Sequence, residues 1–167
     1  MPTARSFDEI VAAYASAIRR LCQAYADDRD DGEDLFQEIL LGIWRALPTF
    51  RNECSERTFI FRIAHNRGMT FAARNRSHLS LDDLSPLADP RADPAEEAAR
   101  AFERERLLNA VRRLPHPQRE AVLLHLEGVP QREIADVQGT TENNVAVRLS
   151  RARIALRAIL GEGDDLP

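Results

Sequence analysis

Amide and guanidinium side chains gather at the start of a helical stretch near the C-terminus, where they could read the edges of DNA bases. Asn143 and Asn144 precede Arg148 and Arg151. Asn can bond adenine and Arg can bond guanine through two hydrogen bonds, and each such pair gives about 1–3 kcal/mol of discrimination. Arg148 and Arg151 lie one turn apart and can share a face. Val147, between them and the amides, could meet a thymine methyl group.

The elements that must position these side chains fit a helix-turn-helix. A short helix is expected over Pro130–Gln138, followed by Gly139, which accepts a left-handed backbone, and by Thr141 as a cap. The second helix, from Glu142 to about Leu160, combines an apolar stripe with an arginine-rich side. In a helix-turn-helix the second helix enters the major groove. A plain helical hairpin with solvated arginines is the alternative.

The charge pattern supports nucleic-acid binding although the net charge of the 167 residues is −4. Acidic segments at 1–38 and 79–99 alternate with basic segments at 39–78 and 100–160. Charge separated in this way suggests two basic surfaces that could meet phosphate.

Composition argues against several other classes. No apolar run approaches a membrane span and no signal core is present, so we expect a cytoplasmic protein without membrane insertion. Cys22 and Cys54 are too few for a disulfide framework or a zinc site. No nucleophile cluster, carboxylate pair or metal-ligand spacing indicates an enzyme, and we expect neither a cofactor nor a metal.

The N-terminal third predicts two helices. Ser6 begins a capping box and an amphipathic helix to about Ala26. The next helix, Gly32–Leu47, carries an apolar arc wider than one packing face needs. It is either buried on several sides or offers a second face to a partner.

A third helix, Glu56 to about Asn75, mixes aromatics and arginines without any acid among the arginines. With His65 and Asn66, this pattern suits single-stranded or melted nucleic acid, because guanidinium groups neutralise phosphate and flat groups stack on bases. The alternative is a core of aromatics with solubilising arginines. We expect the phenylalanines in the core and the arginines on phosphate.

Residues 77–93 are acidic, interrupted by proline and without periodicity, so they predict a linker. The helix after it runs to Leu114 and uses Phe102 among its packing residues. The predicted fold is therefore all-α. Two small helical domains at 1–76 and 94–161, each with a modest core, are joined by a flexible linker, and 162–167 form a tail.

Two segments of the chain, in this order, resemble a known family. DGEDLFQEILLGIWRALPTFR followed by FIFRIAHNR resembles region 2 of bacterial RNA polymerase sigma factors of the extracytoplasmic-function (ECF) group. LPHPQREAVLLHLEGVPQREIADVQGTTENNVAVRLSRARIALR resembles their region 4. The resemblance implies a promoter-specificity subunit that binds core RNA polymerase and promoter DNA and directs initiation. It also implies an anti-sigma partner, which no residue here identifies.

The resemblance assigns three sets of residues. The set expected to dock on core polymerase is Asp34, Leu35, Gln37, Glu38, Leu41 and Trp44. The set expected to hold the melted strand of the minus-ten element, with the loop at 49–55, is Arg57, Arg62, His65, Asn66, Arg67, Arg74 and Arg76. The set expected in the major groove of the minus-thirty-five element is Asn143, Asn144, Val147, Arg148 and Arg151.

Two other functions remain open at this stage. Ala146 and Val147 stand where the family usually has polar or basic residues, which would fit a sigma-like adaptor that has lost promoter reading. The other alternative is a stand-alone helix-turn-helix regulator. The apolar helix around Trp44 distinguishes a sigma factor from such a regulator, because a regulator that acts without polymerase does not need that surface.

Overall fold

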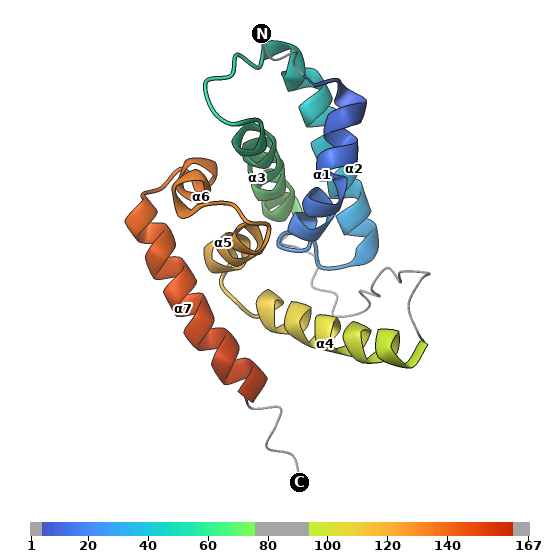
Figure 1. The fold of residues 1–167 in the computed structure, drawn as a ribbon, viewed down its shortest axis with the longest axis vertical. Helices are drawn as coiled ribbons and strands as arrows, with labels where there is room; N and C mark the ends of the chain where they lie inside the picture. Colours follow the sequence, from blue (N-terminus) through green and yellow to red (C-terminus); the bar gives the residue numbers. More distant parts are fainter. Residues whose placement is uncertain (1–4, 76–93, 162–167) are drawn as a thin grey trace.

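The computed structural model describes residues 5–75 and 94–161, and every regular element in these ranges is helical (Figure 1). The elements are α1 (Phe7–Cys22), α2 (Arg29–Ala46), the short 3-10 helix η1 (Leu47–Thr49), α3 (Glu56–Asn75), α4 (Pro94–Arg112), α5 (His116–Leu126), α6 (Gln131–Gln138) and α7 (Glu142–Gly161). The all-α prediction is confirmed. The linker at 77–93, Arg76 and the tail at 162–167 lie outside the described residues.

Local hydrogen bonds fix the helix starts. The Ser6 hydroxyl accepts from the Glu9 backbone N–H at 3.3 Å, and the Glu9 carboxylate accepts from the Ser6 N–H at 2.7 Å, which confirms the capping box. The second helix begins at Arg29, earlier than predicted, because Asp28 accepts from the Asp31 N–H at 2.8 Å and caps it.

Helices α1, α2 and α3 form the N-terminal half. Their facing residues, including Ile18, Leu35, Ile39 and Ile60, have no exposed surface. The ring of Tyr25 lies directly over Gly68 of α3. A Cβ added at Gly68 would come within 2.6 Å of this ring. Gly68 is therefore needed for this close approach.

The C-terminal half contains the predicted helix-turn-helix in α6 and α7. Gly139 ends α6 with φ +60, and the Thr141 hydroxyl accepts from the Asn144 N–H at 3.2 Å at the start of α7. The expectation that Phe102 packs in the preceding helix is wrong, because its side chain is 65% exposed. Helix α4 reaches the core at its C-terminal end, where Val111 is buried.

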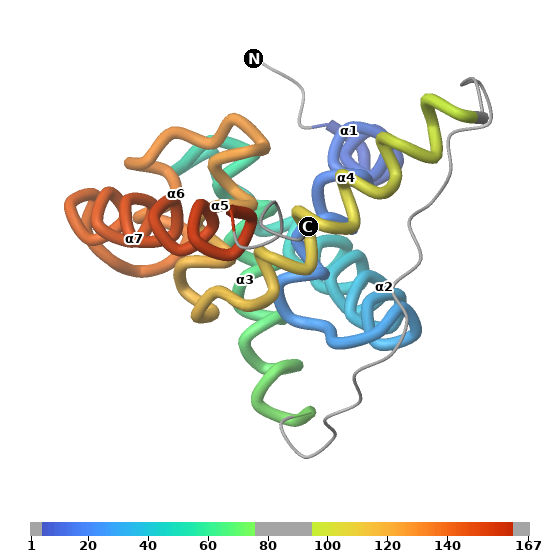
Figure 2. Tube along the Cα trace, turned by 90° about the horizontal axis from the view of Figure 1, so that it is seen from below, coloured from blue at the N-terminus to red at the C-terminus, as the bar shows by residue number. Residues whose placement is uncertain are grey.

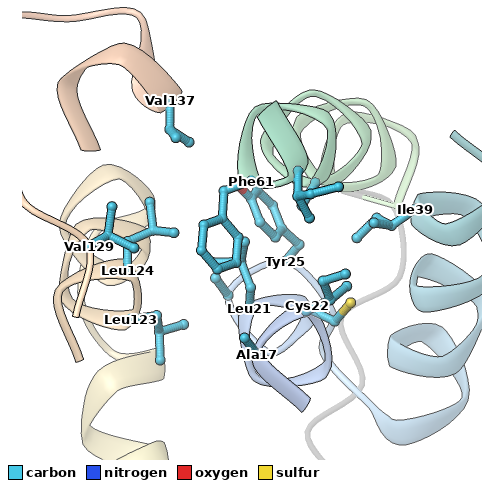
Figure 3. Close-up of a cluster of buried hydrophobic side chains, with 14 of the residues drawn as sticks. Ala17, Leu21, Cys22, Tyr25, Ile39, Phe61, Leu123, Leu124, Val129 and Val137 are labelled. Atoms are coloured by element: carbon cyan, nitrogen blue, oxygen red, sulfur yellow. The ribbon is translucent and has the colours of Figure 1, made fainter. Parts of the chain in front are cut away.

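The two halves are packed against each other, α6 against α3 and α5 against α1. Figures 1 and 2 show α5 and α6 beside α3, with α1 and α2 on its other side. One buried cluster runs through both halves: Leu124 and Val129 belong to the same core as Leu21 and Phe61 (Figure 3). The prediction of a separate modest core in each half therefore does not describe this arrangement.

Substituting Gly68 with alanine should destabilise the protein. The added methyl group meets a rigid ring, and overpacking of this kind costs about 1–3 kcal/mol. Gly32→Ala is the matched control, because its Cβ would meet only Ala26 at 3.8 Å and alanine favours the helix. Urea unfolding followed by circular dichroism measures both variants. Equal stability of the two variants would contradict the close approach.

Candidate interfaces for DNA and polymerase

The predicted major-groove residues lie along α7, which forms an outer edge of the molecule (Figure 1). Asn143, Val147 and Arg151 follow one another at helical spacing and all are exposed. They form one open face. Asn144 is also exposed, and its amide donates to the Thr140 hydroxyl at 3.0 Å. Arg148 is half-buried and donates to the Gln138 side chain at 2.7 Å, so it is turned toward α6.

The basic residues of α3 do not share one environment. Asn66, Arg62 and Arg67 are exposed, as a strand-binding surface requires. Arg74 is paired with Glu38 of α2 at 2.8 Å, and Arg57 lies 3.4 Å from Glu133 of α6. The interpretation that these arginines lack a compensating acid is therefore wrong for these two, because the acids come from other helices.

His65 lies between the two halves of the chain. Its Nδ1 is 2.8 Å from the Glu120 carboxylate and 3.2 Å from the Tyr25 hydroxyl. Tyr25 donates to the same carboxylate, and so does the Gln138 amide at 2.8 Å. In this arrangement His65 contacts α5 and is not an open part of the strand-binding surface.

Glu120 is the buried centre of this group, with 1% of its surface exposed. Burial by itself would raise the pKa of its carboxyl group. The hydrogen bond and charge of His65, with hydrogen bonds from Tyr25 and Gln138, outweigh burial and hold the pKa of Glu120 below its ordinary value. Burial and the neighbouring carboxylate raise the pKa of Tyr25. Glu120 is thus a buried carboxylate held by both halves.

A hollow beside α3 could receive a base. The rings of Phe50 and Phe59 stack there with centroids 4.4 Å apart, and Arg51 and Arg62 line the same hollow. Aromatic rings next to guanidinium groups can stack a base and hold its phosphate. Sequence reasoning identified the loop at 49–55 but missed the aromatic pair, whose only signal is one phenylalanine within that loop and one shortly after it.

The outer face of α2 carries the predicted polymerase-binding residues, with one exception. Trp44 is 59% exposed and Leu41 is 47% exposed, and Asp34 and Gln37 are also exposed on this helix. Glu38 is half-buried beside Arg74. Leu35 is not part of this surface, because its side chain has no exposed area and packs in the core. Its apolar character serves the fold.

Comparisons with known proteins identify the family of the chain. Residues 10–78 match the family model for Sigma-70 region 2, and residues 104–156 match the model for Sigma-70, region 4. The ECF RNA polymerase sigma factor SigM of Mycobacterium tuberculosis is 29% identical over 159 residues, which cover 93% of this chain and 78% of SigM. The chain belongs to the ECF sigma factors.

Two solved sigma factor structures resemble this sigma factor in fold. CnrH, a sigma factor of Cupriavidus metallidurans, solved with the cytosolic domain of CnrY, aligns with a TM-score of 0.69 at 25% identity over 93% of this chain and 88% of CnrH. RpoE of Bartonella quintana, solved with the anti-sigma factor NepR, aligns with a TM-score of 0.74 over 93% of this chain and 96% of RpoE. At 20% identity, that second likeness concerns the fold alone.

Membership of this family defines the role of the protein in RNA polymerase. Sigma factors are promoter-specificity subunits of RNA polymerase and are not enzymes. The helix-turn-helix of α6 and α7 falls largely inside the region 4 match, and α1–α3 fall largely inside the region 2 match. Within the described ranges, no helix is both long enough and apolar enough to span a bilayer.

Glu120 and Glu133, whose carboxylates join the two halves of the chain, should make the stability of this sigma factor acid-sensitive. The pKa of Glu120 and that of Glu133 both lie below the ordinary value of 4.5, so their contribution is present above pH 4.5 and is lost as pH falls through their folded values. The free energy of unfolding in urea should therefore decrease as the pH falls below 4.5.

Glu120→Gln is the variant that tests the source of this dependence. It should be less stable at neutral pH by about 1–3 kcal/mol, the cost of disturbing a buried hydrogen-bonded group, and its stability should depend less on acid. An unchanged acid dependence in this variant would show that Glu120 does not contribute.

Proposed function

We propose that three separate surfaces of this sigma factor bind core polymerase, the melted minus-ten strand and the minus-thirty-five duplex. The division follows the predicted boundaries, with 1–76 as region 2, 77–93 as the linker, 94–161 as region 4 and 162–167 as the tail. The observation that carries the proposal is the exposed apolar face of α2 at Leu41 and Trp44, in a chain that also contains a helix-turn-helix. A stand-alone regulator has no use for that face.

The α2 face docks on polymerase through a large apolar anchor with polar neighbours. Trp44 and Leu41 supply the exposed apolar area, and Asp34, Gln37 and Glu38 surround them on the same helix. Tryptophan is enriched among the few residues that dominate binding energy at protein interfaces. The partner surface is expected to be the clamp helices of the largest polymerase subunit, as the family resemblance implies.

The hollow at Phe50 and Phe59 receives an unstacked base of the minus-ten element. Extrusion of a base from a duplex costs a few kcal/mol, and stacking on an aromatic side chain returns about 1–3 kcal/mol per base. The exposed Arg62, Asn66 and Arg67 follow the strand backbone. Arg76 joins them, and so do Arg57, His65 and Arg74 by exchanging their present carboxylate partners for DNA. Strand opening is thus driven by binding, and polymerase performs the phosphoryl transfer.

The α7 face enters the major groove at the minus-thirty-five element. Asn143 and Arg151 are open for hydrogen bonds to base edges, and Val147 is open for contact with a thymine methyl group. Asn144 and Arg148 join them by exchanging their present partners, Thr140 and Gln138, for DNA.

An anti-sigma partner and a cytoplasmic location complete the proposal. The likeness to CnrH, whose structure was solved with the cytosolic domain of CnrY, supports a protein partner of this kind. The decisive experiment is run-off transcription with purified core polymerase on a genomic fragment library. Mapped start sites that share two spaced elements are expected. A chain that neither co-elutes with core polymerase nor directs initiation would overturn the proposal.

Arg151→Ala should weaken promoter-dependent transcription by about 10- to 100-fold, since one base contact gives about 1–3 kcal/mol. Binding to core polymerase should be unchanged. Arg157→Ala is the control, because it removes the same charge farther along α7, where no base contact is proposed. Run-off transcription and gel filtration with core polymerase measure the two properties. Equal loss in both variants would contradict the assignment of Arg151.

Leu41→Ala with Trp44→Ala should weaken core polymerase binding by more than about 2 kcal/mol, as loss of an interface anchor does. Phe102→Ala is the control: its side chain is similarly exposed but lies on α4. Fluorescence titration of labelled core polymerase gives the affinities, with circular dichroism to show that both variants fold. Unchanged affinity in the folded double variant would refute this docking face.

A further inference from the structure

A cavity of about 550 Å³ lies between the two halves of the chain. Its volume falls in the range of roughly 300–1,000 Å³ that is usual for small-molecule sites. Met69 and Ala72 of α3 and Pro117 of α5 form apolar parts of its wall, and Arg119 and Arg148 contribute guanidinium groups. An apolar wall with a few polar groups that converge on it is the usual composition of a ligand site.

The guanidinium of Arg119 is the group in this wall whose bonding is least complete. It donates to the carbonyls of Ala24 at 3.0 Å and Leu114 at 3.2 Å, and to that of Arg112. In the part of the chain that the structure describes, no carboxylate forms an ion pair with it, and its buried Nε–H has no hydrogen-bond partner. Burial lowers the pKa of Arg119, and only the exposed Asp27 acts against this.

Two further features make the surroundings of Arg119 favourable for an anion. The neighbouring Arg112 also has a buried Nε–H without a partner in the described ranges, and burial together with the charge of Arg119 lowers the pKa of Arg112. The first turn of α5, which begins at His116, lines the cavity, and the N-terminus of a helix favours negative charge. Buried donors without partners are rare, and a bound ion is one explanation for them.

The buried acid of the wall does not cancel this positive charge. Glu120 already accepts hydrogen bonds from Tyr25 and Gln138 and lies 2.8 Å from Nδ1 of His65. Arg148 donates to the neutral side chain of Gln138, so its charge is not paired by that contact. The cavity therefore places incompletely bonded cations beside an apolar wall.

We propose that this cavity binds a small organic anion. Its carboxylate or phosphate group accepts hydrogen bonds from Arg119, and its apolar body lies against Met69 and Ala72. Because the wall comes from both halves, such a ligand binds the packed arrangement and stabilises it. The inference does not depend on the proposed roles of α2, α3 and α7 in binding polymerase and DNA.

Met69 provides a local probe of the site. The chain contains two methionines, Met1 and Met69, so isotope labelling of the methionine methyl groups gives NMR a signal in the cavity wall. Titration of the full chain with benzoate or adenosine monophosphate should shift the Met69 signal until it saturates, and the tighter of the two identifies the anionic group. At about 100 times its dissociation constant, this anion should raise the melting temperature by about 5–10 °C.

Matched probes separate the contributions of charge and of the apolar body. Benzamide and adenosine lack the anionic group and should bind at least about tenfold more weakly, because charge-assisted hydrogen bonds are stronger than neutral ones. Inorganic phosphate lacks the apolar body and should also bind more weakly than the organic anion. These comparisons need no substitution in the protein.

Substitutions in the wall test the location of the site. Arg119→Gln should abolish binding, but it also disturbs the bonds to three carbonyls and is expected to lower stability. Ala72→Glu is the second variant: it places a like charge in the wall and should weaken binding by at least about tenfold. Ala73→Glu is its matched control, because Ala73 is exposed on the same helix and does not line the cavity. Circular dichroism shows whether each variant folds.

Three results would overturn the proposal. The first is the absence of a saturable Met69 shift with both organic anions. The second is equal affinity for an anion and its uncharged counterpart, or for inorganic phosphate and the organic anion. The third is equal weakening of binding by Ala72→Glu and Ala73→Glu in folded chains.

Discussion

The buried carboxylate of Glu120 constrains how the two halves of the chain meet. A carboxylate with 1% exposed surface is costly unless it is paired and hydrogen-bonded. Gln138 supplies one partner from the same half, but Tyr25 and His65 come from the other half. The group is therefore satisfied only when α5 lies against α3, and the surrounding apolar residues close over it as one continuous core.

This constraint gives the three proposed binding surfaces unequal access. The Trp44 face of α2 and the outer edge of α7 are open to solvent. Arg57 and His65 of α3 lie in the contact between the halves, where Glu133 of α6 and Glu120 of α5 bind them, whereas Arg62, Asn66 and Arg67 stay exposed. The exposed residues of the two outward surfaces are open to partners in this arrangement, while Arg57 and His65 are already engaged by the other half.

Much of the fold follows from short-range chemistry and was predicted from the sequence. The Ser6 capping box, the left-handed Gly139 and the Thr141 cap each involve residues within three or four positions of one another. The sequence-based predictions were wrong where tertiary packing determines which side chains are buried. The stripe containing Phe102 looked like a packing face, but α4 meets the rest of the core near Val111 and leaves Phe102 exposed. Asp28 began α2 earlier because several acids in that run could serve as the cap.

The sequence by itself determined the helix-turn-helix, the arginine-rich α3 and the family, because spacing along a helix fixes which side chains share a face. Only the tertiary structure decided which of those side chains are free. Arg57 and Arg74 were both expected to contact phosphate, yet Glu133 and Glu38 pair with them from other elements. Leu35 and Trp44 look alike in the apolar arc of α2, yet one is buried and the other exposed. Charge compensation and burial depend on residues far apart in the chain. The local periodicity of the sequence does not indicate which helices will pack side by side.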